Sequence, residues 1–325
     1  MYKYDSSYLC TRDIKEKIMQ QRLSTREDYS RRINIIVEYI NNHLADDIDL
    51  EVLAGISNFS PYHFHRILKA FLGEPIGAFI TRVRVETAAR LLRYTDMSVQ
   101  EIAYSVGYDV PSSLSKAFKQ FYDITPTDYK NNKTYTIMKP LKINPGLELS
   151  ERIINLEPRQ AIYICLIGDY KKNDYGMAWR KLWQYVSTSG KFKDEMERIC
   201  GSTDKSNIIH QMLIEGKIAH IGIYHDDPKV TECDKQRADI CLALPFKMEP
   251  KGEIGVKDIA GGKYAAYKYQ GSYDKLDEVY DTIYGKYIPD GGYQIDARPG
   301  FEIYLNDPEC TDPNKLESEI YVPIV

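Results

Sequence analysis

The sequence lacks the features of a membrane protein, a secreted protein or an enzyme of a familiar motif class. No apolar run approaches the length of a membrane span, and the first 30 residues are charged, without the apolar core of a signal peptide. The six cysteines are scattered without a Cys-x-x-Cys pair, which favours reduced thiols in a cytosol. No glycine-rich phosphate loop and no Ser/His/Asp motif is present. We therefore expect a cytoplasmic protein with no catalytic residues, no cofactor and no membrane partner.

Histidine is also scarce, and its spacing argues against a metal site. Only six histidines occur in 325 residues. His63 and His65 are two residues apart, so on a helix they point in different directions, whereas helical metal ligands are spaced by three or four residues. We expect no bound metal.

A strong positive charge is likewise missing. The net charge is −4, and residues 1–130 hold 17 Lys and Arg against 17 Asp and Glu. Residues 60–122 carry a mild excess of 8 against 5. Contacts with nucleic-acid phosphates would therefore depend on where the basic residues stand, not on bulk charge.

What the chain does have is a pattern that repeats after 50 residues. The recurring positions are apolar and basic: Phe64, Arg66, Leu68, Lys69 and Phe71 return as Leu114, Lys116, Phe118, Lys119 and Phe121. Each run follows a short helix and a tight turn. The pattern predicts two helix-turn-helix units in tandem, and such units place their second helix in the DNA major groove.

Local signals predict the first unit. Apolar residues at helical spacing predict a helix over residues 28–44. Asp49 can cap a short helix through Gly55, with Leu50 among its buried residues. Ser60-Pro61 then starts a helix that ends at Gly73 and buries, among others, Phe71.

A long helix over residues 77–94 separates the units and would hold the recognition helices about one DNA turn apart. The second unit opens with a capping box over residues 98–101 and turns at Gly107, where glycine permits a left-handed conformation. Its second helix spans about Val110 to Tyr122, with Phe121 on the buried side.

These residues resemble the DNA-binding domain of the AraC/XylS family. The resemblance rests on residues 102–108 (IAYSVGY), on Phe118-Lys119 and on residues 125–130 (TPTDYK), and it covers about residues 30–130. Asp123 departs from the glycine that the family often has there, but aspartate tolerates a left-handed conformation.

The resemblance implies which residues would contact DNA: Ser60, Tyr62, His65, Arg66, Lys69, Pro111, Ser112, Ser115, Lys116 and Lys119. Arg66 can make a bidentate contact with guanine, and Lys116 can reach the same acceptors. Pro111 offers no hydrogen bond. We therefore expect the recognition helix of the first unit to discriminate between bases and that of the second unit mainly to hold phosphates.

A second repeat lies beyond a polar stretch with two prolines. Residues 221–228 (IGIYHDDP) match residues 301–308 (FEIYLNDP) at an offset of 80. Upstream, residues 161–170 match residues 264–273 at an offset of 103, which places about 23 extra residues within 187–217. Each copy predicts strand, helix, strand, strand, and two copies would form a pseudo-symmetric sheet with a cleft between them.

This half resembles the GyrI-like (gyrase-inhibitor-like) effector-binding domain. The matching runs are residues 301–308 and 319–324 (EIYVPI), within about residues 147–325. The resemblance implies an aromatic pocket with a glutamate, at Glu319 here, that binds cationic, lipophilic molecules.

Alternation along the last strands gives a related expectation. Glu319 and Tyr321 share one strand face, and so do Glu302 and Tyr304. If the two strands pair, these side chains are expected to converge, and carboxylates among aromatic rings suit an organic cation. Further aromatic candidates for the pocket wall are Tyr163, Trp179, Tyr224 and Tyr267.

The sequence thus predicts a multi-domain chain: an extension (1–27), an all-α double helix-turn-helix domain (28–130), a linker (131–146) and an α+β effector-binding domain (147–325). We expect a transcription regulator whose partners are double-stranded DNA, a small effector and, as a further candidate, RNA polymerase. Two alternatives stay open for the second half, a hydrolase-like enzyme and a protein-interaction module. The operator, the effector, the sign of regulation and the oligomeric state do not follow from the sequence.

Overall fold

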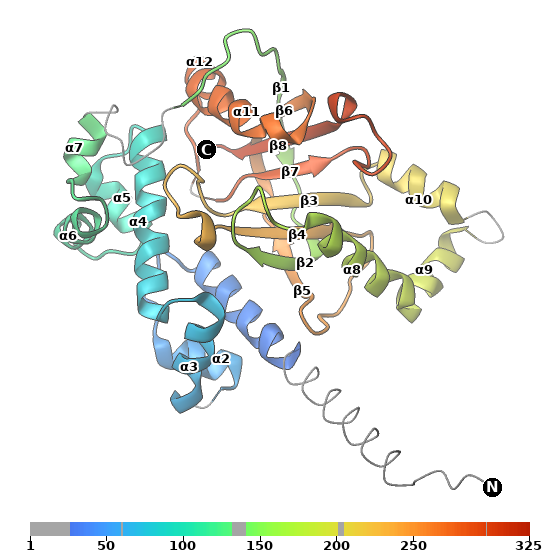
Figure 1. The fold of residues 1–325 in the computed structure, drawn as a ribbon, viewed down its shortest axis with the longest axis horizontal. Helices are drawn as coiled ribbons and strands as arrows, with labels where there is room; N and C mark the ends of the chain where they lie inside the picture. Colours follow the sequence, from blue (N-terminus) through green and yellow to red (C-terminus); the bar gives the residue numbers. More distant parts are fainter. Residues whose placement is uncertain (1–26, 60, 132–140, 201–204, 297) are drawn as a thin grey trace, which may run out of the picture.

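A computed structural model describes residues 27–59, 61–131, 141–200, 205–296 and 298–325. The chain forms a helical half and an α+β half that lie side by side (Figure 1). Within the described ranges, no helix is both long enough and apolar enough to cross a membrane.

The helical half contains the two expected units. Its helices are residues 27–42, α2 (Leu50–Ser57), α3 (Pro61–Leu72), α4 (Ile76–Tyr94), α5 (Val99–Ser105), α6 (Pro111–Tyr122) and α7 (Pro126–Asn131). Asp49 caps α2 by accepting a hydrogen bond from the Glu51 amide, and Ser98 and Glu101 form the expected capping box at α5. Gly107 and Asp123 take the expected left-handed conformations. The local signals therefore identify these caps and left-handed turns correctly, whereas α2 ends at Ser57, two residues after the expected Gly55.

Helix α4 connects two separate hydrophobic cores. Its first half packs with α2, α3 and the helix at residues 27–42, and its second half packs with α5, α6 and α7. Three residues expected in these cores are instead exposed: Leu50 at 36%, Phe71 at 41% and Phe121 at 43%. Leu50 is the first residue of α2, and the two phenylalanines stand in the last turns of α3 and α6. All three therefore lie at helix ends, where the helical spacing does not show whether another helix packs against the side chain.

The α+β half is built on one eight-stranded antiparallel sheet. Its strands are β1 (Ser150–Leu156), β2 (Arg159–Ile167), β3 (Ala219–Tyr224), β4 (Arg237–Ala243), β5 (Gly255–Ile259), β6 (Gly262–Gln270), β7 (Phe301–Tyr304) and β8 (Glu317–Pro323). They lie in the order β1-β6-β8-β7-β3-β4-β2-β5.

Each repeat holds one strand more than the sequence predicts. The first copy is β1, β2, helix, β3, β4, and the second is β5, β6, helix, β7, β8. The first strand of each copy pairs with the other copy, β1 with β6 and β5 with β2. The extra residues of the first copy form α9 (Gly190–Cys200) and α10 (Lys205–Ile214), inside the expected interval.

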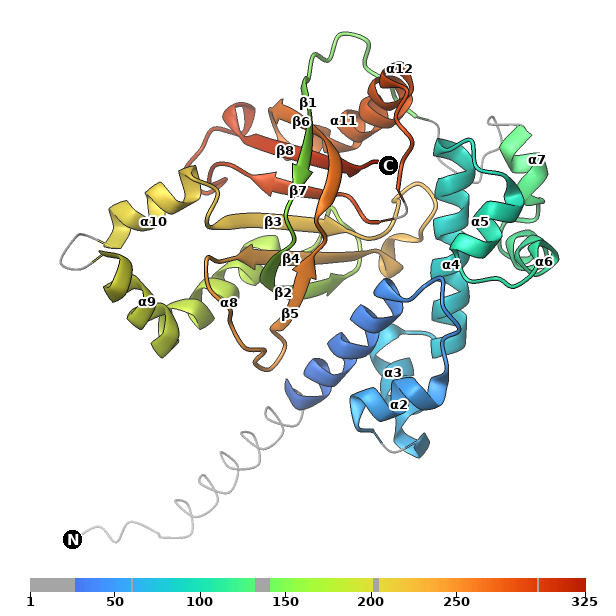
Figure 2. The same cartoon turned by 180° about the vertical axis from the view of Figure 1, so that it is seen from behind.

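Helices cover one face of this sheet. Helix α8 (Tyr175–Thr188) packs on the first copy, and α11 (Leu276–Thr282), a π-helical turn (Ile283–Tyr287) and α12 (Ile288–Gly291) pack on the second. Seen from behind, β1 and β6 cross in front of the other strands of the sheet, and α8 lies behind them (Figure 2).

The two halves make direct polar contacts. Lys257 of β5 forms an ion pair with Glu38 at 2.7 Å, and Arg237 of β4 donates a hydrogen bond to Asn41 at 3.0 Å. The end of the expected linker also lies against the second half, where the Lys142 amide donates to Asp281 at 2.7 Å. The helical half is thus packed against the sheet domain.

Candidate DNA-binding surface and ligand groove

The second helix of each unit presents basic and polar side chains to solvent. On α3 these are His65, Arg66 and Lys69, and on α6 they are Ser112, Lys116 and Lys119. None of the three lysines, nor Arg66, enters an ion pair within the described residues, and all four cations are therefore available to an outside partner.

Two other candidates on α6 are less accessible. Pro111 and Ser115 are half-buried, and the Ser115 hydroxyl donates a hydrogen bond to the Pro111 carbonyl at 3.0 Å. Ser60 and the side chain of Tyr62 lie outside the described part of the structure. The 19 residues of α4 span about 28 Å at 1.5 Å per residue, close to one DNA turn of about 34 Å.

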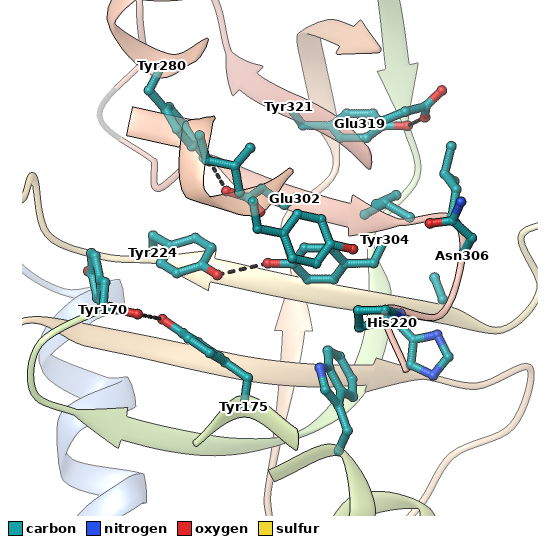
Figure 3. Close-up of a pocket in the computed structure, with 18 of the residues that line it drawn as sticks. Tyr170, Tyr175, His220, Tyr224, Tyr280, Glu302, Tyr304, Asn306, Glu319 and Tyr321 are labelled. Atoms are coloured by element: carbon teal, nitrogen blue, oxygen red, sulfur yellow. Dashed lines mark hydrogen bonds between the residues drawn. The ribbon is translucent and has the colours of Figure 1, made fainter. Parts of the chain in front are cut away.

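The α+β half contains a long groove whose lining includes residues from both faces of the sheet, and its tyrosine-lined centre lies on the helix-covered face. Its volume is about 1980 Å³, more than a single drug-sized ligand occupies. The centre of the groove is lined by tyrosines from both repeats (Figure 3). Tyr224 of β3 and Tyr304 of β7 occupy equivalent repeat positions, and their hydroxyls form a hydrogen bond of 2.8 Å.

Tyr170 and Tyr273 form a second repeat-related pair in the same wall. Tyr170 packs edge-on against Tyr224 at 5.0 Å between ring centroids, and Tyr273 packs against Tyr304 at 5.4 Å. Helix α8 adds Trp179, whose ring lies 6.3 Å from that of Tyr304. The result is an aromatic wall with hydroxyl groups along it.

Glu302 is the carboxylate at the centre of these rings. Its side chain is almost completely buried, with 1% of its surface exposed. The Tyr280 hydroxyl donates a hydrogen bond of 2.8 Å to Glu302 Oε1, whereas Oε2 has no hydrogen-bond partner among the described residues. Burial raises the pKa of Glu302 to about 7, and the hydroxyls of Tyr280 and Tyr304, which both lie close enough to stabilise the charged form, oppose that rise.

The equivalent position in the first repeat is a glycine. Gly222 pairs directly with Glu302 across β3 and β7. A Cβ atom at Gly222 would stand 2.7 Å from the Tyr304 hydroxyl and 3.1 Å from Tyr224 Cε2. The glycine therefore leaves room for the tyrosine pair, and the groove has one central carboxylate instead of two that would repel each other.

The strand register contradicts the expected convergence of Glu302 with Glu319. Opposite residues in β7 and β8 are Ile303 with Glu319 and Glu302 with Ile320. Because opposite residues share a face, Glu319 and Tyr321 lie on the other face from Glu302 and Tyr304. Glu319 lies toward an outer part of the groove, where Arg152 and the Tyr321 hydroxyl each contact it at 2.6 Å.

Two further aromatic candidates do not reach the groove. Tyr163 is buried on the opposite face of the sheet, beneath the Lys257 ammonium at 4.7 Å. Tyr267 is buried against Tyr287, and its hydroxyl donates to Glu151 at 3.0 Å. Both belong to the packed interior of the domain, so their expected place in the pocket wall is wrong. Tyr224, Tyr304 and Trp179 do line the groove.

The candidates missed were mainly Tyr170, Tyr273 and Tyr280. The first two occupy equivalent positions of the 103-residue repeat, so the repeat itself could have identified them. Tyr280 carries no such signal, because only the packing of α11 turns its hydroxyl toward Glu302. No group of three or more His, Cys, Asp or Glu side chains that could hold a metal occurs in the described ranges.

Two protein-family models match the chain. Residues 53–132 match a helix-turn-helix domain, and residues 151–325 match a GyrI-like small molecule binding domain. The second match alone covers more than half of the 325 residues.

Curated relatives match either the helical half or nearly the whole chain. Regulatory protein PocR of Salmonella typhimurium is 36% identical over 94 residues, which are 29% of this chain and 31% of PocR. Transcriptional regulator Rob of the same organism is 22% identical over 316 residues, which are 91% of this chain and 99% of Rob. The chain spans about a third of the length of the first curated relatives it matches.

Solved structures match each half separately. The DNA-binding domain of AdpA, in complex with a target DNA, is 29% identical and covers 30% of this chain and 86% of its own, with a TM-score of 0.29. The EcmrR C-terminal domain is 15% identical and covers 55% of this chain and 99% of its own, with a TM-score of 0.39.

Proposed function

Since the chain belongs to the GyrI-like small molecule binding family and joins that domain to an AraC-family helix-turn-helix domain, we propose that it is a transcription regulator. In this proposal it binds double-stranded DNA through α3 and α6, and an aromatic organic cation in the groove of the α+β half. The matched curated relatives are regulators by name, which favours this reading over an enzyme.

The single observation that carries the ligand class is the buried Glu302 carboxylate. One oxygen accepts the Tyr280 hydrogen bond, and the other has no partner of standard hydrogen-bond geometry within the described chain, where the Tyr304 hydroxyl is the further group near the carboxylate. An unpaired buried charge is costly, so a cation that enters the groove is favoured by the charge it neutralises. The surrounding tyrosine and tryptophan faces add cation–π attraction and exclude water from a lipophilic ligand.

An open groove with this lining disfavours the interaction-module alternative. A protein-interaction face would present a filled, flat surface, whereas this groove has space and a central charge. For the DNA partner, the support is the family match together with the exposed Arg66 and Lys116 on the second helices of the two units.

A pair of shape-matched ions tests the ligand class. Tetraphenylphosphonium and tetraphenylborate have nearly the same shape and opposite charge. The only two tryptophans of the chain, Trp179 and Trp183, both line the groove, so intrinsic fluorescence reports on its occupancy. We expect the full chain at pH 8 to bind the cation and to reject the anion.

Two variants give the control. Glu302→Gln keeps the shape of the side chain and removes its charge, and should weaken cation binding by tenfold or more, a loss of about 1.4 kcal/mol. Glu319→Gln removes a carboxylate from the opposite face, beside Arg152, and should leave the cation affinity within twofold. Equal affinity for the two ions, or equal losses in the two variants, would refute the proposed ligand class.

A further inference from the structure

Tyr94 belongs to both halves of the molecule. It is the last residue of α4, the helix that joins the two DNA-binding units. Its side chain packs on the core of the second unit and also on the core beneath α11. Tyr94 also lines the ligand groove, together with Tyr280, Tyr284 and Glu302.

A continuous series of contacts connects Tyr94 with the central carboxylate. The rings of Tyr94 and Tyr284 lie 4.8 Å apart between centroids, and those of Tyr284 and Tyr280 lie 6.4 Å apart at an angle of 15°. Both distances fall within the range of attractive aromatic pairs. The Tyr280 hydroxyl then donates its 2.8 Å hydrogen bond to Glu302. We call the side chains of Tyr94, Tyr284 and Tyr280 the aromatic ladder.

The middle of the ladder stands on an unusual piece of helix. Tyr284 lies in the π-helical turn Ile283–Tyr287, where the Ile288 amide donates to the carbonyl five residues earlier, at Ile283. Such turns are rare, appear mostly as single turns inside α-helices, and occur frequently at functional sites.

The same turn is held by the segment that leads from the DNA-binding half. A Cβ atom at Gly285 would stand 2.6 Å from Ile143 Cδ1 and 3.3 Å from Leu141 Cδ1, so those side chains pack directly on the π-helical turn. The turn therefore contacts α4 through Tyr94 and the chain that follows α7 through residues 141 and 143.

We propose that the aromatic ladder couples the ligand groove to the DNA-binding half, with Tyr94 as its positioning residue on α4. This inference rests on the proposed function of the groove. A cation at Glu302 neutralises the carboxylate that accepts the Tyr280 hydrogen bond, and so weakens that bond and shifts Tyr280, Tyr284 and, through them, Tyr94. Because α4 sets the distance between α3 and α6, a shift at its end changes how well both recognition helices meet one DNA duplex.

Coupling between two sites is reciprocal, so DNA must change the affinity for the cation by the same factor that the cation changes the affinity for DNA. We expect a factor of about five or more, the lower end for coupled sites. The duplex for this measurement is selected from a random library by the full-length chain. Tetraphenylphosphonium affinity is then measured by tryptophan fluorescence with and without that duplex.

Variants on both sides of the interface identify the route. Tyr94→Phe keeps the ring and should keep the coupling factor. Tyr94→Leu, and independently Tyr284→Leu from the other domain, should reduce it to less than twofold. The coupling factor is a ratio of cation affinities with and without the duplex, so a change in cation affinity alone in a leucine variant does not enter it. A cooperative thermal unfolding transition shows that each variant is folded.

A second measurement needs no cation. Hydrogen exchange of residues 276–291 is compared with and without the duplex, and we expect a change in the wild type and in Tyr94→Phe, but not in Tyr94→Leu. If the wild type does not bind the cation, the proposed ligand is wrong. Hydrogen exchange with and without the duplex then still tests the aromatic ladder. The inference is wrong if the duplex does not change the hydrogen exchange of residues 276–291 in the wild type. It is also wrong if Tyr94→Leu retains the full coupling factor.

Discussion

Replacing Glu302 by glutamine should make the ligand-free protein more stable at alkaline pH. Burial raises the pKa of this carboxyl from an ordinary value of 4.5 to about 7. The folded state therefore holds the proton more tightly than the unfolded state does. The stability associated with the neutral form is fully present below about pH 4.5 and is lost as the pH rises through 7. Glutamine cannot ionise, so the variant does not suffer this loss.

The size of the effect follows from the two pKa values. A difference of about 2.5 units at 1.36 kcal/mol per unit corresponds to about 3 kcal/mol in the free energy of unfolding at pH 8. For the α+β half, which spans residues 150–323, this corresponds to a rise of several degrees in the melting temperature. Scanning calorimetry of wild type and Glu302→Gln between pH 5 and pH 8 measures it directly.

The control for this prediction is Glu319→Gln. Glu319 is paired with Arg152 at 2.6 Å, so its removal should not produce a gain that grows with pH. If wild type and Glu302→Gln show melting temperatures that run parallel across the range, then Glu302 is not a buried acid whose ionisation costs stability, and the reasoning fails.

Three further predictions concern binding. The affinity for tetraphenylphosphonium should fall about tenfold per pH unit below 7, because the cation must displace the proton of Glu302, and an affinity that is independent of pH would contradict this. Arg66→Ala should cost about 1–3 kcal/mol in binding to a selected duplex and relax the base preference of the protein. Lys116→Ala should lower the affinity for all sequences and reduce the salt dependence of binding. Unchanged DNA binding by both variants would show that α3 and α6 are not the recognition helices. Gly222→Ala should weaken cation binding at least severalfold, since its Cβ would stand 2.7 Å from the Tyr304 hydroxyl, and should leave the DNA affinity unchanged. An unaltered affinity for the cation would show that the tyrosine pair does not shape the site.

The helical half was predictable because its signals are local. Caps, a left-handed glycine at 107 and apolar residues at helical spacing place each helix within a few residues of its observed bounds. Phe71 and Phe121 were misplaced because spacing reports which face of a helix is apolar, and not how far the neighbouring helix extends along it.

The ligand groove was less predictable because it depends on how strands pair. The repeat correctly identified Tyr224 and Tyr304 as equivalent, but alternation within each strand cannot tell which faces of two strands coincide. The register alone separates Glu319 from Glu302. The register of β2 with β4, which places Tyr163 beside Cys241 on the far face, likewise cannot be read from the pattern.

The contacts between the halves also lie beyond sequence patterns. Tyr94 has the spacing of an ordinary residue at the end of a helix, and nothing in its neighbourhood announces Tyr284 as its partner 190 residues later. Only the packing of α11 and its π-helical turn on α4 brings the two rings together.

The account's central claim is that an organic cation binds beside Glu302. Tetraphenylarsonium has the shape and charge of tetraphenylphosphonium, and its arsenic atom can be located by anomalous X-ray scattering in crystals of the full chain. We predict one anomalous peak in the groove, on the side of the Glu302 carboxylate and against the aromatic wall that Tyr224 and Tyr304 form. A peak beside Glu319 on the opposite face, or none in the groove of a chain that binds the ion in solution, would contradict it.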